Sequence, residues 1–145
     1  MRKALYILCQ CTWGALQSLC GLAVFLVNMG RRHYVYHGAI VTEWKSPYSA
    51  SLGMFVFISE QHIGREAYKP ILVHEYGHTL QSLMLGPLYL PAVALPSCIW
   101  CMTPALQKMR VRKKLSYYSF YTESWANKLG ELAVKEPSMG QAPIY

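Results

Sequence analysis

The residues Ile71-Leu72-Val73-His74-Glu75-Tyr76-Gly77-His78-Thr79-Leu80 contain the pattern His-Glu-x-x-His within an apolar segment. Residues four apart lie on one face of a helix, so His74 and His78 can present their imidazole nitrogens to one metal ion. Glu75 is one step round the helix, where a carboxylate can take a proton from a metal-bound water. Lys69-Pro70 precedes the run, and proline is well tolerated in a first helical turn. We therefore expect a metal-binding helix that starts near Pro70.

Chance is the alternative explanation of this pattern, because two histidines and a glutamate can share a solvated helix face. The flanking residues Leu72, Val73 and Leu80 make the helix largely apolar. Buried ionisable groups need partners, and without a metal ion the three groups would be nearly unpaired. The apolar surroundings therefore favour a metal site.

Composition indicates a single domain at a membrane. The chain has 145 residues, of which 53% are hydrophobic and only 14% charged, which is too apolar for an ordinary soluble domain. The formal net charge is +7, but the basic residues are clustered, which suggests a membrane surface. No nucleic-acid-binding signature accompanies this charge, so we expect no nucleic-acid partner. The five cysteines lie mostly in apolar runs and do not suggest a disulfide framework.

Residues 4–30 form an uncharged run after the basic residues Arg2 and Lys3. It is long enough to cross about 30 Å of hydrocarbon as a helix. A signal peptide is the alternative, but no small-x-small cleavage site followed by polar sequence appears. We therefore expect residues 1–30 to be an uncleaved transmembrane anchor. Four small or polar residues recur at helical spacing and should face another protein element: Gln10, Gly14, Gln17 and Gly21.

Residues 34–58 are rich in β-branched and aromatic residues and predict an antiparallel β-hairpin or small sheet. Lys45-Ser46-Pro47-Tyr48 lies between two such runs and reads as the turn. Gly38 and Gly53 lie inside the runs and suggest bulges or close backbone contacts.

Residues 79–107 form a second uncharged run, interrupted by Gly86-Pro87, Pro91, Pro96 and Pro104. These breaks argue against one straight spanning helix. Five basic residues within 108–114 follow and indicate a contact with a membrane surface. We expect a helix over residues 115–132 and a loose tail over residues 136–145.

A catalytic zinc site usually has three protein ligands and leaves one position open for water. The third ligand must then come from elsewhere, and Tyr121-Thr122-Glu123-Ser124-Trp125-Ala126-Asn127 offers Glu123. With this segment the chain resembles the gluzincin class of zinc metallopeptidases, which pair a His-Glu-x-x-His helix with a later helix bearing Glu-x-x-Ala-Asp or a close variant. It looks most like the membrane-embedded members, the CaaX prenyl-protein proteases and the bacterial heat-shock membrane proteases. The resemblance covers roughly residues 70–130.

The resemblance implies a role for each matching residue. His74, His78 and Glu123 would bind Zn²⁺, and Glu75 would be the general base. Ala126 would let the second helix approach the first. Asn127 stands where the family usually has aspartate; its amide oxygen can accept the ring N–H of a ligand histidine, although it carries no charge.

The implied fold is α+β: a mostly helical, minimal zincin-like membrane domain. Glu123 can meet His74 only if residues 79–107 enter the bilayer and return to the same side of it. Because a full double crossing needs about forty residues, we expect a shallow re-entrant hairpin of two short helices. Its bend should lie between Gly86-Pro87 and Pro96.

The implied function is that of a membrane-bound zinc peptidase acting on peptides or membrane proteins. The strand at residues 51–58 would bind an extended substrate by β-augmentation, or would be sheet core. Tyr117, Tyr118 and Tyr121 are candidates for stabilising the oxyanion. We expect an integral protein of the cell inner membrane. Basic clusters favour the cytoplasmic side, and the larger cluster, within residues 108–114, lies on the same side of the membrane as the site, so we expect the site to face the cytoplasm. Self-association or a partner membrane protein is consistent with the small size.

Two other functions fit the same sequence. The first is a non-catalytic membrane adaptor with a structural zinc or a degenerate site. A structural site would fill all four positions, with Cys98 or His37 as the candidate fourth ligand. The second is a membrane-surface anchor in which the basic cluster is the function and the motif is incidental.

Overall fold

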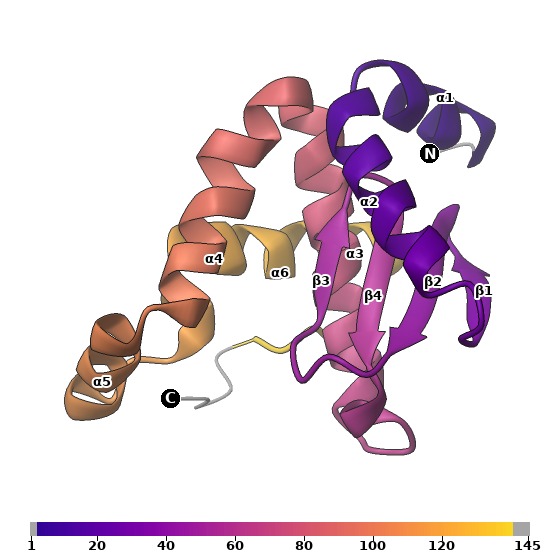
Figure 1. Ribbon diagram of the computed structural model, residues 1–145. Helices are drawn as coiled ribbons and strands as arrows, with labels where there is room; N and C mark the ends of the chain where they lie inside the picture. The colour runs from indigo at the N-terminus through magenta and orange to yellow at the C-terminus, as the bar shows by residue number, and fades with distance from the viewer. Residues whose placement is uncertain (1–2, 141–145) are drawn as a thin grey trace.

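The computed structural model describes residues 3–140 and contains six α-helices and one four-stranded sheet. The expectation of a mostly helical α+β fold is confirmed. Figure 1 shows the sheet between helices, with α4 and α5 extending away from it. The elements in chain order are α1 (Lys3–Thr12), α2 (Ala15–Val27), β1 (His33–Tyr36), β2 (Ala39–Trp44), β3 (Ala50–Leu52), β4 (Phe55–Ser59), α3 (Tyr68–Leu85), α4 (Leu95–Met102), α5 (Pro104–Lys113) and α6 (Tyr121–Val134). Short 3₁₀ turns occupy Glu60–His62, Gly86–Leu88 and Tyr117–Ser119, and a π-helical turn occupies Leu90–Ala94.

The sheet has the strand order β1-β2-β4-β3, with antiparallel outer pairs and a parallel central pair. We expected one hairpin over residues 34–58 with its turn at residues 45–48, and this was wrong. The segment contains two hairpins, β1 with β2 and β3 with β4. His37 and Gly38 have φ angles of 49° and 100°, and Gly53 has a φ of 59°. These left-handed conformations make two tight turns in place of bulges. The close backbone contact that we also expected is present at Gly53, where a Cβ atom would lie 2.6 Å from the Ser18 backbone nitrogen. The segment 45–49 is a crossover that lets β4 pair with β2 in parallel.

Both faces of the sheet are covered, α2 on one face and α3 on the other (Figure 1). All five residues of β4 are buried, as expected for a central strand with helices on both sides. Val56 and Ile58 join the core that contains Ile71 and Leu72 of α3. The sheet therefore fixes the position of α3.

The N-terminal apolar run forms two helices, α1 and α2, bent by 97°, instead of the single straight anchor that we expected. Its polar stripe faces protein, as predicted: Gln10 donates to the Thr79 carbonyl oxygen at 2.9 Å, and Gln17 donates to Ser82 Oγ at 2.8 Å. Within residues 3–140, no single helix is both long enough and apolar enough to cross a membrane. Two bent pairs pass that test together, α1 with α2 and residues 90–102 with α5.

The second apolar run bends twice, and the first bend lies where we expected it: α3 ends at Leu85, Gly86 has a φ of 54°, and the chain then turns back into α4 (Figure 1). Residues 90–102 continue as one helical segment through both prolines within it, because a π-helical turn starts at Leu90 and α4 starts just before Pro96. A second break occurs at Thr103, which is extended (φ −76°, ψ 115°) because the following Pro104 disfavours helical backbone there. The chain bends by 74° at this point and then returns through α5 toward α6.

Helices α3 and α6 pack closely over two glycines. A Cβ atom on Gly77 would lie 1.9 Å from the Ala126 carbonyl oxygen, and one on Gly130 would lie 2.2 Å from the Val73 carbonyl oxygen. Ala126 is fully buried in this contact, in the place that the resemblance implied.

The C-terminal helix and tail differ in part from expectation. The helix expected over 115–132 begins at Tyr121 and ends at Val134. Of the tail expected over 136–145, residues 141–145 lie outside the described residues. In the described part, Ser138 is buried and its hydroxyl donates to Glu131 Oε1 at 2.6 Å, so this part is packed and not loose.

Candidate metal centre

Two helices bring three potential metal ligands to one point. His74 and His78 lie one turn apart on α3, and Glu123 lies in the first turn of α6. Glu123 Oε2 is 3.2 Å from His74 Nε2 and 3.4 Å from His78 Nε2. The three side chains are almost completely buried, and one donor atom from each lies within 4.8 Å of the others. This group can bind a metal ion.

The far nitrogen of each histidine is held by an amide oxygen. His74 Nδ1 lies 2.8 Å from Asn127 Oδ1, and His78 Nδ1 lies 2.7 Å from Gln81 Oε1. The amide nitrogens are also used, because Asn127 donates to the Gly140 carbonyl oxygen at 3.3 Å and Gln81 donates to the Thr122 carbonyl oxygen at 2.8 Å. These bonds fix the orientation of both amides, so in each neutral imidazole Nδ1 is the donor and Nε2 carries the lone pair.

The arrangement of lone pairs indicates that a cation belongs at this point. Glu123 Oε2 is buried and has no hydrogen-bond donor, and the two groups nearest to it present lone pairs. Its other oxygen, Oε1, accepts from Ser97 Oγ at 2.5 Å and from Thr122 Oγ1 at 3.0 Å. The carboxylate is thereby held with one oxygen free for an ion. The donor set of two imidazoles and one carboxylate is one that catalytic zinc sites use.

Without a metal ion, a proton can relieve the repulsion between the lone pairs of Glu123 Oε2 and the two histidine Nε2 atoms. Burial disfavours the charged imidazolium of His78, but the Glu123 carboxylate outweighs burial and raises the pKa of His78 to about 9. Burial likewise disfavours ionised Glu123, yet His78 and His74 hold the pKa of this carboxyl well below its usual range. The site therefore concentrates negative charge that either a proton or a metal ion can neutralise.

The expected fourth ligands of a structural site do not join this group. Among residues 3–140, the cluster of histidine, cysteine and acidic donors contains His74, His78 and Glu123 and no further member. His37 lies in the β1–β2 turn beside Tyr36. Three protein donors leave a coordination position open, which is the pattern of a catalytic site.

Glu75 lies beside the three donors and is held by the edge strand of the sheet. Ser51 Oγ of β3 donates to Glu75 Oε2 at 3.0 Å, and both residues are buried. Burial raises the pKa of Glu75, while the neighbouring histidines and the Ser51 hydrogen bond oppose that rise. A carboxylate in this setting can accept and release a proton close to the metal position.

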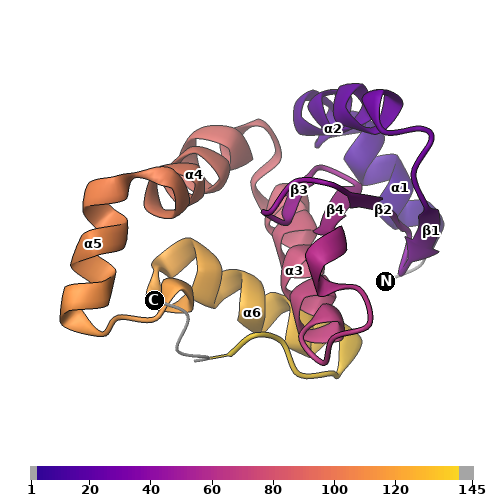
Figure 2. The same ribbon diagram turned by 60° about the horizontal axis from the view of Figure 1, so that its bottom comes forward.

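A cavity of about 860 Å³ connects these groups with the outside. One wall is β3 with the loop before it, and the other is formed by α4, α5 and the turn at Tyr117–Ser119. Figure 2 shows α4 and α5 standing apart from β3, with α6 and α3 along the lower side of the view. The Tyr118 ring packs against His74 with a centroid distance of 5.0 Å. The Tyr89 hydroxyl donates to the Ser51 carbonyl oxygen at 3.2 Å, which connects the residue just before the π-helical turn to β3.

The structure brings together all five residues singled out in the sequence: His74, Glu75, His78, Glu123 and Asn127.

Sequence reasoning missed three supporting residues, Ser51, Gln81 and Ser97. Gln81 follows His78 by three residues on the same helix face, a spacing that could have identified it. Ser51 and Ser97 are set by tertiary packing, and nothing in the local sequence signals them. Tyr121 leaves the list of oxyanion candidates, because its exposed hydroxyl donates to the Ala92 carbonyl oxygen at 2.7 Å.

No protein-family model, curated protein or solved structure matches this chain.

Proposed function

We propose that this protein is a membrane-bound zinc metallopeptidase of the gluzincin type, resembling the CaaX-protease and heat-shock membrane-protease group. The observation that carries the proposal is the position of Glu75. This carboxylate is buried beside a three-donor metal centre, on a cavity, and is held by the edge strand that borders the same cavity. A metal site that only stabilised the fold would need neither an adjacent carboxylate nor an open cavity.

Zn²⁺ is the metal that suits these ligands best, because two neutral imidazoles and one carboxylate in a buried site are its usual donors. His74 Nε2, His78 Nε2 and Glu123 Oε2 would hold it. When bound, zinc lowers the pKa of a coordinated water to about 7 and polarises a carbonyl group. Asn127 and Gln81 keep both histidines in the tautomer that can bind it.

Glu75 carries the proton in the proposed hydrolysis. Ser51 occupies its Oε2, so Oε1 is the oxygen that takes the proton from the attacking water. The carboxyl group then gives that proton to the leaving amine as the peptide bond breaks. Burial of Glu75 raises its pKa and makes it a stronger base than an exposed carboxylate.

The cavity walls offer places for a peptide substrate. β3 is an edge strand, paired on one side with β4, and its residues line the cavity. An extended peptide can add to such an edge by backbone hydrogen bonds. Tyr118 is the candidate donor to the oxyanion because its ring contacts His74, and burial raises its pKa so that the hydroxyl keeps its proton.

Membrane attachment is supported by large apolar side chains that the fold leaves exposed. They lie on α1, the turn between α1 and α2, α2, the end of α3, the turn that follows it, and α4. The set includes Leu5, Leu8, Trp13, Leu16, Leu19, Leu26, Met84, Leu88, Leu95 and Ile99. The exposed basic residues of α5 would meet anionic lipid headgroups. The end of α3, the turn at Gly86–Leu88 and α4 correspond to the re-entrant segment of this proposal.

Glu75→Gln tests the mechanism, because the amide keeps the shape of the side chain but cannot take a proton. We expect the detergent-purified variant to bind about one zinc per chain, as the wild type does, and to lose peptide hydrolysis by at least about 10³-fold. Zinc content by atomic emission and turnover of a fluorogenic peptide library would measure this. Unchanged proteolysis would reject the mechanism, and a zinc-loaded wild type without any hydrolysis would favour the adaptor.

A further inference from the structure

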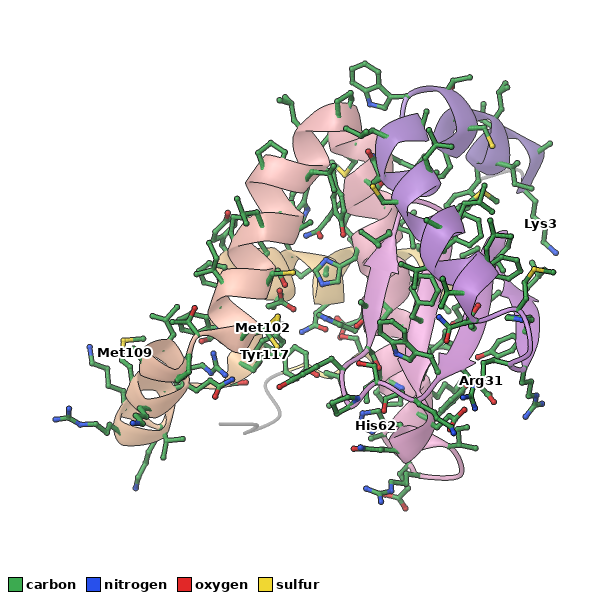
Figure 3. All side chains as sticks on the ribbon, in the orientation of Figure 1. Lys3, Arg31, His62, Met102, Met109 and Tyr117 are labelled. Atoms are coloured by element: carbon green, nitrogen blue, oxygen red, sulfur yellow. The ribbon has the colours of Figure 1, made fainter. Side chains whose placement is uncertain are left out.

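Arg110 differs from the other basic residues of α5, because its side chain is only 5% exposed. Its neighbours Lys108, Arg112 and Lys113 are exposed to solvent. The Arg110 guanidinium lies over the Trp100 ring, 4.9 Å from its centroid, and 5.4 Å from the centroid of the Tyr117 ring. Figure 3 shows Tyr117 on the side of α5 that faces the sheet. Arg110 therefore points inward while the rest of the basic cluster points outward.

The charge of Arg110 has no counter-charge within the described part of the chain. Its Nη1 donates to the Trp100 carbonyl oxygen, but its buried Nε has no acceptor. None of the ion pairs found in residues 3–140 includes it. Arginine stays charged at any physiological pH, and a buried cation without an anion is unfavourable. The guanidinium therefore keeps a charge and a hydrogen-bond donor that no described residue satisfies.

The Arg110 side chain lines the cavity that holds the metal centre. Arg110 and Tyr117 line the same cavity as His74, Glu75 and Glu123. The guanidinium is also held rigidly, because Trp100 Nε1 donates to the Tyr117 carbonyl oxygen at 2.9 Å. A fixed planar donor in an apolar wall is suited to bind one planar anion with defined orientation.

We propose that Arg110 is a specificity residue that binds a carboxylate group of the peptide substrate. The proposal rests on the proposed peptidase function and adds the substrate class, peptides with a carboxylate near the cleaved bond. A carboxylate is favoured over a lipid phosphate because exposed lysines and arginines of α5 are available to headgroups, whereas Arg110 is turned into the cavity. The carboxylate can come from the peptide C-terminus or from an acidic side chain.

Binding to the Glu75→Gln protein tests this without turnover. Three fluorescent peptides of one sequence serve as probes: a free C-terminal acid, the C-terminal amide, and the amide with a glutamate near its end. We expect at least one carboxylate peptide to bind on the order of tenfold more tightly than the neutral amide. Adding Arg110→Met should bring that ratio to about one, and Arg110→Lys should keep part of it. The peptide that shows the preference identifies the source of the carboxylate.

Arg112→Met is the matched control, since it removes an exposed charge from the same helix and should leave the ratio unchanged. Equal affinity of all three peptides for the parent protein would overturn the proposal. So would a preference that persists in Arg110→Met, or a loss of affinity that is equal for charged and neutral peptides. Should Arg110→Met not fold, Arg110→Lys decides, because the proposal requires its ratio to lie below that of the parent. If the wild type hydrolyses peptides but the Glu75→Gln protein shows no preference for carboxylate peptides, the role of Arg110 is rejected and the peptidase function is kept. If the preference depends on Arg110 but the wild type hydrolyses no peptide, the peptidase function is rejected and the carboxylate site is kept.

Discussion

One amide oxygen decides which nitrogen of His78 faces the metal position. Gln81 accepts the Nδ1 proton and is itself fixed by its bond to the Thr122 carbonyl oxygen, next to the ligand Glu123. The same side chain thus orients a ligand on α3 and connects it to the helix that supplies the third ligand. Groups that orient ligands in this way set metal affinity almost as strongly as the ligands do.

Gln81→Ala should therefore weaken zinc binding by about 10–100-fold while leaving all three ligands in place. Removal of the acceptor frees the His78 ring to rotate or to change tautomer, and it leaves the Thr122 carbonyl oxygen without its donor. Competition with a fluorescent chelator measures the affinity. Gln61→Ala is the control, because Gln61 is exposed and remote from the motif. Equal zinc affinity in Gln81→Ala and wild type would show that the amide has no such role.

The stability of the metal-free protein should fall as the pH rises. The Glu123 carboxylate outweighs the effect of burial and raises the pKa of His78 to about 9, above its ordinary value of about 6.5. The folded state therefore holds this proton more tightly than the unfolded state does. Its contribution to the free energy of unfolding is complete below about pH 6.5 and is lost as the pH rises through about 9. In the zinc-loaded protein the ion takes the place of the proton, so this loss should be absent.

Thermal unfolding across this pH range, with and without a strong chelator, measures the effect. We expect the melting temperature of the chelated protein to fall from about pH 6.5 to about pH 9 and that of the zinc-loaded protein to change less. A chelated protein that becomes more stable over the same range would contradict the proposed pairing of His78 with Glu123.

The residues that sequence predicts best are those related by the repeat of one helix. His74, Glu75 and His78 follow from helical spacing, whereas the roles of Glu123 and Asn127 were expected from the resemblance of residues 121–127 to the second gluzincin motif. Ser51 and Arg110 do not follow from any local pattern. A serine in a strand and an arginine in a basic run are common, and only the folded chain brings one to Glu75 and turns the other inward.

At the scale of elements, the contact between α3 and α6 positions the site. Gly77 lies between the two ligand histidines, and its missing side chain lets the Ala126 backbone approach α3. Gly130 does the same one turn further along α6, against Val73. The metal ligands on these helices can meet only while the two backbones remain this close.

Gly77→Ala should destabilise the protein by about 2 kcal/mol or more and reduce zinc binding. Alanine usually favours a helix by about 1 kcal/mol over glycine, but here its Cβ would lie 1.9 Å from a backbone oxygen. Chemical denaturation and zinc titration measure the two effects. Gly30→Ala is the matched control, because a Cβ there meets nothing within 4 Å, and it should change stability by less than about 0.5 kcal/mol. Normal stability of Gly77→Ala would show that the helices can separate without cost.

The hairpins show why element order is harder to predict than element type. Lys45-Ser46-Pro47-Tyr48 has the composition of a turn, and the β-rich runs on either side suggested that it joined two strands of one hairpin. The tight turns lie instead at Gly38 and Gly53, where positive φ angles are required. Pairing of β2 with β4 depends on α2 and α3 covering both faces, which no window of the sequence contains.

At the scale of the whole molecule, apolar and charged surfaces separate toward different ends. α1, α2 and the turn after α3 lie together at one end in Figure 1, and most of the large exposed apolar side chains are on these elements and on α4. The loop before α3 and the basic end of α5 lie at the other end (Figure 1). Because α1 and α2 are bent by 97° and bonded to α3 through Gln10 and Gln17, the N-terminal run is held along the body of the protein.

We therefore expect the protein to enter the bilayer from one side, with the start of α1, the loop before α3 and the end of α5 all facing the same aqueous compartment. Single cysteines at Lys3, Arg65 and Lys113, each exposed, can be introduced into a variant whose native cysteines are replaced by serine. In sealed proteoliposomes an impermeant maleimide should label the same fraction of the protein at each of the three positions. The three positions should also remain equal to one another after permeabilisation. A straight anchor through residues 4–30 would instead place Lys3 across the bilayer from Arg65, at about 1.5 Å per residue. Protection of Lys3→Cys alone would support the straight anchor. Protection of Lys113→Cys alone would mean that the end of α5 lies on the far side of the bilayer, which would separate Glu123 on α6 from the histidines on α3.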